Sequence, residues 1–165
     1  MKIIFLDIDG VLNSERSFLA GSHKIATMPD VPYCEKVLLA TIDPIAVDLV
    51  NKICEEVDAY IVLSSTHRLH CDTIDDVRDY LAAIGINRAR VFSATPRLNT
   101  IRGIEIQTWI DDRPGTVTAY VIIDDSRDTT PGQIAEHFVH CDGLVGLDSH
   151  GYFNALRILG CPVEA

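Results

Sequence analysis

The sequence is poor in positive charge. Its 165 residues carry 14 basic side chains against 24 acidic ones, which gives a formal net charge of −10 at pH 7. Proteins that hold nucleic acid through a broad basic face, or that dock on anionic membranes, have the opposite balance. We therefore expect no extended nucleic-acid-binding face and no membrane partner.

Long apolar runs and paired cysteines are also missing. No stretch of about 18 apolar residues occurs, so no membrane-spanning segment is predicted. Two aspartates interrupt the N-terminal stretch MKIIFLDIDG, which is therefore not a secretory signal. The five cysteines lie far apart without a CxxC pair, which argues against both a disulfide framework and a zinc site. Reduced, mostly buried thiols predict a cytoplasmic protein.

The sequence does contain enough apolar residues for one core. An apolar fraction of 47% predicts a single folded domain over residues 1–165 rather than a disordered chain. The acids are unevenly divided, with 17 aspartates and seven glutamates. Because aspartate is a poor helix former that collects at caps, turns and metal sites, the question is where in the fold the excess gathers.

Three short runs rich in isoleucine and valine have the pattern of buried strands. They are Lys2–Leu6, Ala59–Leu63 and Tyr120–Ile123. None of them alternates between apolar and polar residues, as expected for central strands of a parallel sheet covered on both faces. Val91–Phe92 and Phe138–Val139 are weaker candidates for further strands.

Four helices are predicted between these strands. The first begins at Pro44 behind Asp43 as N-cap, and the others cover about Thr73–Ile84, Arg102–Asp111 and Ser149–Leu159. Strands that alternate with helices predict a three-layer α/β/α fold with a central, mostly parallel sheet.

Residues 14–42 break this alternation. They separate the first strand from its helix, where about two to six residues suffice, and they show few periodic apolar positions. The segment contains the turn-forming residues Gly21, Ser22, Pro29, Asp30 and Pro32. Since long loops of compact domains are usually functional, we expect a flap or small cap over the site; a surface excursion without a role is the alternative.

Polar side chains gather where the three strands are predicted to end. They are Asp7, Asp9, Ser64, Ser65, Asp124 and Asp125. Ligands of doubly wound folds bind at the carboxyl ends of the strands, so these groups are expected to meet. Crowded carboxylates repel one another unless a cation lies between them, and an all-oxygen acidic site suits Mg²⁺. The alternative is that each aspartate merely caps a helix or a turn.

Four sequence blocks follow one another along the chain. They are FLDIDGVLN at Phe5–Asn13, IVLSSTHR at Ile61–Arg68, RGIEIQTWI at Arg102–Ile110 and the strand with its acidic pair at Tyr120–Asp125. In this order the blocks resemble the haloacid dehalogenase-like (HAD) superfamily of phosphatases, which implies a Rossmann-like fold. A still closer fit is to the HAD domains of Swiss-Army-Knife RNA-repair proteins and their phage and bacterial relatives. His67 stands where such relatives often carry tryptophan.

The resemblance implies a two-step hydrolysis of phosphomonoesters with Mg²⁺ as cofactor. Asp7 is then the nucleophile that forms an aspartyl-phosphate, and Asp9 protonates the leaving oxygen and later activates water. The metal ligands implied are Asp7, the backbone carbonyl of Asp9 and Asp125. Asp124 then positions the cation or the basic partner, or exchanges roles with Asp125. Gly10 allows a close approach of the backbone.

A hydroxyl and a fixed cation complete the implied site. Ser64, the first polar residue after its strand, is preferred over Ser65 as the ligand of a phosphoryl oxygen, with a helix cap as the alternative for both. All four lysines precede the second block, so the cation must be an arginine. Arg102 at a helix start is the first candidate, and a salt bridge to Glu105 is the alternative.

The resulting hypothesis is a Mg²⁺-dependent phosphatase. The resemblance implies a phosphorylated small molecule such as a nucleotide, or a phosphorylated nucleic-acid terminus, bound near Gly10, Asn13, Ser65 and Arg68. The acidic composition favours a short end or a mononucleotide. Two alternatives stay open: a HAD domain that binds phosphate or a partner with little turnover, and a receiver-like signalling domain, which the missing late lysine disfavours. The sequence leaves the oligomeric state open.

Overall fold

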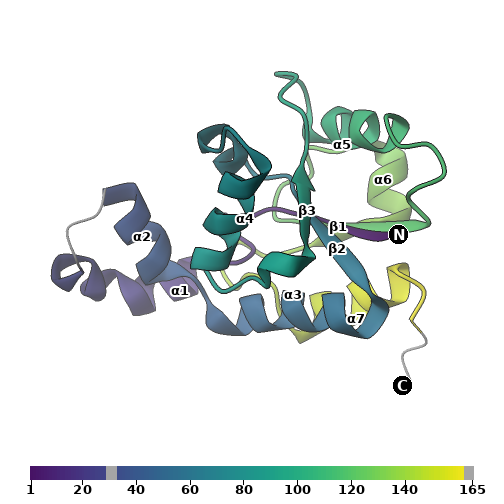
Figure 1. Ribbon diagram of the computed structural model, residues 1–165. Helices are drawn as coiled ribbons and strands as arrows, with labels where there is room; N and C mark the ends of the chain where they lie inside the picture. The colour runs from purple at the N-terminus through teal and green to yellow at the C-terminus, as the bar shows by residue number, and fades with distance from the viewer. Residues whose placement is uncertain (29–32, 162–165) are drawn as a thin grey trace.

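A five-stranded sheet forms the centre of the computed structural model, which describes residues 1–28 and 33–161 (Figure 1). Its strands are β1 (Lys2–Leu6), β2 (Ala59–Leu63), β3 (Val91–Ala94), β4 (Ala119–Asp124) and β5 (Phe138–His140). All neighbours pair in parallel, in the order β3-β2-β1-β4-β5. The five predicted strands are thus confirmed, and the described sheet is parallel throughout.

Helices cover both faces of this sheet, which gives the predicted α/β/α layers (Figure 1). One face carries α3 (Pro44–Val57), α4 (Ile74–Ala83) and α7 (Ser149–Ile158), and the other carries α5 (Arg102–Asp111) and α6 (Pro131–Glu136). Two short 3-10 helices, η2 (Thr66–His70) and η3 (Arg88–Arg90), follow β2 and precede β3. The four predicted helices are confirmed, whereas the six residues of α6 are too few to show a periodic apolar pattern.

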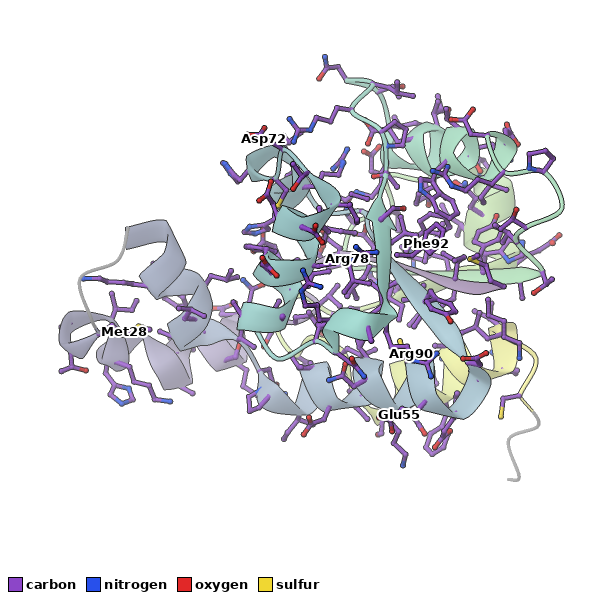
Figure 2. The ribbon with its side chains drawn as sticks, viewed as in Figure 1. Met28, Glu55, Asp72, Arg78, Arg90 and Phe92 are labelled. Atoms are coloured by element: carbon purple, nitrogen blue, oxygen red, sulfur yellow. The ribbon has the colours of Figure 1, made fainter. Side chains whose placement is uncertain are left out.

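The alternation of side chains along β1 divides the core into two halves. Ile4 and Leu6 belong to the half under α3, α4 and α7, whereas Phe5 faces α5. Trp109 of α5 is fully enclosed there and meets Phe5 edge-on, with ring centroids 5.4 Å apart. Phe92 of β3, which is labelled in Figure 2, packs against the same tryptophan. Burial on both faces fixes the register of β1 and hence the position of the loop that follows it.

The segment after β1 is helical rather than an open loop. It contains α1 (Glu15–Gly21), η1 (Ser22–Thr27) and α2 (Tyr33–Thr41), and these helices project to one side of the sheet, with Met28 near their outer end (Figures 1 and 2). Gly21 ends α1 where a side chain would overlap the backbone of Ala40 in α2. The turn-forming residues Pro29, Asp30 and Pro32 lie outside the described residues.

The base of this insertion is tied to α3. Asp43 caps α3 as predicted, because its Oδ1 accepts a hydrogen bond of 2.9 Å from the N–H of Ile45. Its other oxygen, Oδ2, accepts one of 2.7 Å from Nη2 of Arg16 in α1. The start of the insertion and the start of α3 therefore share one carboxylate.

Three of the cysteines are buried free thiols, as expected, namely Cys54, Cys71 and Cys141. The side chain of Cys34 lies outside those described. None of the described helices combines the length and the apolar character needed to cross a membrane.

The strand order places the carboxyl end of β1 at a switch point. From β1 the chain moves outward through β2 to β3, and it then returns to the other side of β1 for β4 and β5. Neighbouring connections leave in opposite directions at such a point, which opens a crevice beyond the carboxyl ends of the strands. The loops after β1, β2 and β4 converge there.

Candidate active site

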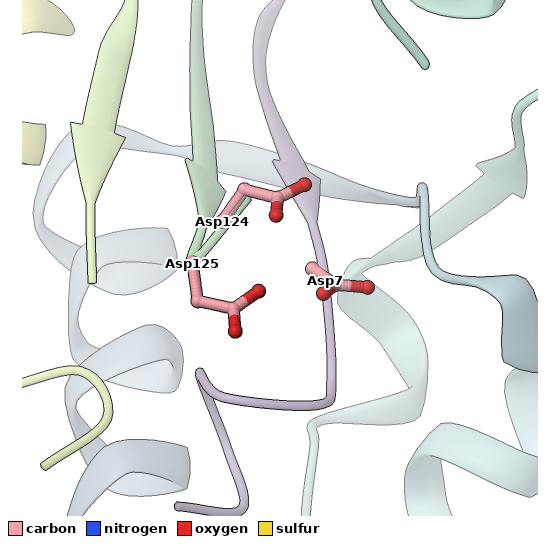
Figure 3. Close-up of side chains that lie close together, drawn as sticks. All are labelled: Asp7, Asp124 and Asp125. Atoms are coloured by element: carbon pink, nitrogen blue, oxygen red, sulfur yellow. The ribbon is translucent and has the colours of Figure 1, made fainter. Parts of the chain in front are cut away.

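Three aspartates meet at the carboxyl ends of β1 and β4. Asp7 directly follows β1, Asp124 ends β4 and Asp125 follows it. Figure 3 shows the three side chains gathered at this edge of the sheet, and one carboxylate oxygen of each lies within 4.8 Å of the others. Asp7 and Asp124 are buried, whereas Asp125 is partly exposed. The topology therefore brings together three of the four predicted aspartates.

Arg102 supplies positive charge beside this cluster. It is the first residue of α5, and its Nη1 lies 3.3 Å from Oδ1 of Asp7 and donates a hydrogen bond to Oδ2 of Asp124. Gly103 allows the start of α5 to come this close, because a side chain there would overlap the backbone of Thr130. The arginine expected from the sequence thus bridges two of the three carboxylates.

Burial opposes the ionisation of these carboxyls. It raises the pKa of Asp7, an effect that Arg102 partly offsets. It also raises the pKa of Asp124 to about 6, and the neighbouring Asp7 adds to this shift. Although burial alone would lower the pKa of Arg102, the carboxylates of Asp7 and Asp124 raise it. One guanidinium does not neutralise three carboxylates, so the cluster favours a further cation.

The donor set fits a hard divalent cation such as Mg²⁺, because all three aspartates offer carboxylate oxygens. Both oxygens of Asp124 are engaged, Oδ2 by Arg102 and Oδ1 by the N–H of Ser126 at 2.8 Å. Within the described part of the chain, no hydrogen bond or ion pair engages the carboxylate of Asp125. Asp125 and Asp7 are therefore better placed to contact a metal than Asp124.

Asp9 lies outside this cluster, and its side chain is 60% exposed. Nε2 of His67 lies 3.0 Å from its Oδ2, and Nδ2 of Asn13 donates to its Oδ1 at 2.9 Å. These hydrogen bonds stabilise the ionised carboxyl and lower the pKa of Asp9, with His67 as the largest cause. The predicted metal contact of Asp9 involves its backbone carbonyl and stays a prediction.

Gly10 and Asn13 shape the loop that carries Asp9. Gly10 has a φ angle of 72°, and a Cβ atom at this position would overlap the carboxylate of Asp125. Only glycine therefore allows the loop to approach Asp125 without strain. Oδ1 of Asn13 accepts a hydrogen bond of 3.1 Å from the N–H of Gly10. Asn13 therefore stabilises the loop itself, and its expected contact with substrate stays a prediction.

Ser64 and Ser65 are both buried at the end of β2. The hydroxyl of Ser65 caps η2, and hydrogen bonding from the Ser65 side chain acts to lower the pKa of Asp7 against the larger effect of burial. The hydroxyl of Ser64 has no hydrogen-bond partner within the described ranges. The preference for Ser64 over Ser65 as the ligand of a phosphoryl oxygen stays a prediction.

Comparison with known proteins identifies the family. The sequence profile described as the HAD domain in Swiss Army Knife RNA repair proteins matches residues 3–151. The chain belongs to this family of HAD domains. No curated protein and no solved structure matches the chain.

A buried ion pair joins the second and third sequence blocks of this HAD domain. Arg68 donates from Nη2 to Oε2 of Glu105 and from Nη1 to the backbone oxygen of Ser65 at 2.8 Å. Oε1 of Glu105 accepts a hydrogen bond of 2.9 Å from the N–H of Leu98. Arg68 is therefore part of the framework, and its expected contact with substrate stays a prediction. Because Glu105 is engaged by Arg68, the alternative salt bridge from Arg102 to Glu105 is not formed in the described structure.

Replacing Glu105 with alanine is expected to lower the free energy of unfolding by about 3–5 kcal/mol, because Arg68 is left charged and unpaired in buried surroundings. Urea denaturation at pH 7 measures this loss. Asp79→Ala is the control, since its ion pair with Arg88 is exposed and its removal is expected to shift the midpoint little. Equal midpoints for the two variants would contradict the role assigned to the buried pair.

A cavity of about 420 Å³ opens beside Asp9. It is lined by Asp9, Gly10 and Asp125 together with Phe18 and Val37 of the insertion. Phe18 is 46% exposed, which leaves much of its ring open. The insertion of this HAD domain therefore contributes apolar side chains to the cavity beside Asp9.

The place of Phe18 and the contact of His67 with Asp9 are not predicted from the sequence. The segment that contains Phe18 resembles a loop, although Ser14 and Ser17 form a capping box that marks a helix start. His67 lies in the second sequence block, at a position where relatives often have tryptophan. Its contact joins two segments that are 58 residues apart, and no local pattern reveals such a pair.

Proposed function

We propose that this HAD domain hydrolyses phosphomonoesters through an aspartyl-phosphate on Asp7, with Mg²⁺ as cofactor. The proposal rests on the groups that surround the carboxylate of Asp7. Its buried carboxylate lies beside the guanidinium of Arg102 and the oxygens of Asp124 and Asp125. The family to which the chain belongs is consistent with a phosphatase-like enzyme.

The proposed reaction has two steps at phosphorus. In the first, a carboxylate oxygen of Asp7 bonds to phosphorus, the bond from phosphorus to the ester oxygen breaks, and the leaving oxygen takes a proton from Asp9. In the second, Asp9 accepts a proton from water, whose oxygen bonds to phosphorus. The bond to Asp7 breaks, and inorganic phosphate and the free carboxylate result.

Positive charge is needed because a phosphate dianion approaches several carboxylates. Arg102 provides a planar guanidinium that suits phosphoryl oxygens, and hydrogen bonding from Ser65 acts to lower the pKa of Asp7 against the larger effect of burial. Mg²⁺ held by Asp7, Asp125 and the backbone carbonyl of Asp9 would supply the remaining charge neutralisation. Asp124 keeps Arg102 in place through its hydrogen bond.

The protonation state of Asp9 depends on whether a charged substrate is bound. In the free protein the hydrogen bonds to His67 and Asn13 keep the pKa of Asp9 low, so this carboxyl is ionised and suited to the second step. A bound phosphate dianion opposes ionisation of a nearby carboxyl and raises its pKa. Substrate binding therefore favours the protonated form that the first step requires.

We further propose that the substrate is a nucleotide or the phosphorylated end of a nucleic acid. Asp9 acts on the leaving oxygen, so the cavity beside it receives the leaving group. The exposed ring of Phe18 in that cavity offers a surface on which a base can stack. The net charge of −10 favours a mononucleotide or a short end over a long polynucleotide.

A substrate panel tests this proposal. Nucleoside 5′- and 3′-monophosphates and oligonucleotides phosphorylated at either end are compared with sugar phosphates and glycerol phosphate. For at least one nucleotide or phosphorylated oligonucleotide, kcat/KM is expected to be about tenfold higher than for the sugar phosphates and glycerol phosphate. Phe18→Ala is expected to remove most of this advantage, whereas Leu19→Ala, at the neighbouring exposed position, is the control.

Two results would count against the proposal. Equal rates for sugar phosphates and nucleotides, unchanged in Phe18→Ala, would contradict the assignment of the substrate class. Binding of phosphate without turnover of any ester in the presence of Mg²⁺ would favour the alternative, a HAD domain that binds phosphate or a partner.

A further inference from the structure

His67 contacts Asp9 from a different part of the fold. It belongs to η2, which follows β2, whereas Asp9 lies in the loop after β1. The distance from Nε2 of His67 to Oδ2 of Asp9 is 3.0 Å. Since an ionised carboxylate only accepts hydrogen bonds, Nε2 is the donor. Together with Nδ2 of Asn13 on Oδ1, both oxygens of Asp9 have a donor.

The imidazole of His67 is itself held in place. Its ring stacks on that of Tyr80 in α4, with centroids 5.6 Å apart and an angle of 25° between the planes. Its backbone N–H donates to the hydroxyl of Ser65 at 3.4 Å. The side chain is only 24% exposed, against 60% for that of Asp9. A fixed ring therefore contacts a carboxyl that is otherwise open to solvent.

An exposed aspartate ordinarily samples several rotamers. Proton transfer needs the carboxyl within about 2.6–3.2 Å of the oxygen that gains or loses the proton. A misplacement of about 1 Å can cost on the order of 10²-fold in rate. A residue that fixes the Asp9 carboxyl in the cavity therefore contributes to the rate of hydrolysis without contacting the phosphorus atom.

We propose that His67 is a positioning residue, which holds the carboxyl of Asp9 on the leaving-group side of the cavity through the hydrogen bond from Nε2. This inference rests on the proposed function, because it assigns a purpose to the acid and base of that reaction. Asn13 belongs to the same loop as Asp9, whereas His67 comes from η2, a different part of the fold. His67 anchors Asp9 to β2 and α4.

Two variants separate the hydrogen bond from the packing of the ring. His67→Phe keeps an aromatic ring against Tyr80 and removes the donor. His67→Gln returns an N–H donor at a similar reach. Both are compared with the wild type over phosphate esters whose leaving groups range from p-nitrophenol to simple alcohols, and kcat/KM is measured for each.

His67→Phe is expected to lower kcat/KM at least about tenfold for alkyl esters, whose leaving oxygens need a proton. The loss for p-nitrophenyl phosphate is expected to stay below about threefold, because p-nitrophenolate leaves without protonation. His67→Gln is expected to recover most of the lost rate. In an Asp9→Asn background His67→Phe is expected to have no further effect, since no acid remains to be positioned.

Several results would overturn the inference. A loss in His67→Phe that is equal for all esters would indicate a merely structural role, and so would an additive loss in the Asp9→Asn background. Crystal structures give a readout that does not depend on activity: an Asp9 side chain in the same rotamer in His67→Phe and wild type would contradict the inference. A wild type without Asp7-dependent hydrolysis would instead contradict the proposed function.

Discussion

Replacing Asp7 with asparagine is expected to lower phosphatase turnover by about 10³-fold or more, to the background rate. Asparagine has the shape of aspartate but no charged oxygen that can bond to phosphorus. The variant is also expected to unfold at the same temperature as the wild type or higher. Burial raises the pKa of Asp7, so the ionised carboxyl costs stability at pH 7, and asparagine resembles its protonated form.

Initial rates with p-nitrophenyl phosphate and thermal unfolding measure these two effects. Asp112→Asn is the matched control, because Asp112 is exposed at the end of α5, away from the cluster. Fluoroberyllate, which mimics an aspartyl-phosphate, is expected to bind the wild type with Mg²⁺ and to lose its affinity in Asp7→Ala. Turnover retained in Asp7→Asn would remove Asp7 as the nucleophile.

Removal of Mg²⁺ is expected to have an effect of similar size. With EDTA, hydrolysis of p-nitrophenyl phosphate should fall to background, since three carboxylates with oxygens within 4.8 Å then face the phosphate with only Arg102 to offset them. Mg²⁺ at about 100 times its dissociation constant should stabilise the folded state by about 2.7 kcal/mol. For a domain of this size that raises the midpoint of thermal unfolding by about 5–10 °C.

Asp125→Asn separates specific binding at the cluster from general effects of salt. Its carboxylate has no other partner in the described structure, so the variant should keep its fold and lose most of the stabilisation by Mg²⁺. Asp111→Asn, at an exposed position, should retain it. Equal activity in Mg²⁺ and in EDTA would exclude a role for the metal in turnover.

The sheet and its long helices could be predicted because their signals are local. Runs of isoleucine and valine mark β1, β2 and β4, and the Asp43-Pro44 pair marks the start of α3. The sequence predicts a loop for the insertion, because α1 and α2 are short and Gly21 and Ser22 are typical of turns. Gly21 instead allows two helices to come close together. A glycine at a helix contact and a glycine in a turn are identical in sequence.

The acidic cluster could be predicted from topology, because parallel strands end at one edge of a sheet. The contacts that hold the cluster could be predicted only in part. The contact of Arg102 with Asp124 agrees with the positioning role that the resemblance implies for Asp124, whereas the pair of Arg68 with Glu105 is not predicted. Such pairs depend on how the loops after β2 and β4 pack on the start of α5. That packing is decided by tertiary structure and leaves no periodic trace in the sequence.

The insertion is separate from the elements that carry the proposed reacting groups. Mutations can therefore change the choice of substrate without changing those groups. Asp7, Asp124 and Arg102 are carried by β1, β4 and α5, which the buried core holds in register. Phe18 and Val37 line the cavity beside Asp9 and Asp125 from α1 and α2. Exchanging these two helices between relatives should therefore redirect the choice of ester while the reacting groups stay in place, which makes the insertion a natural unit for engineering.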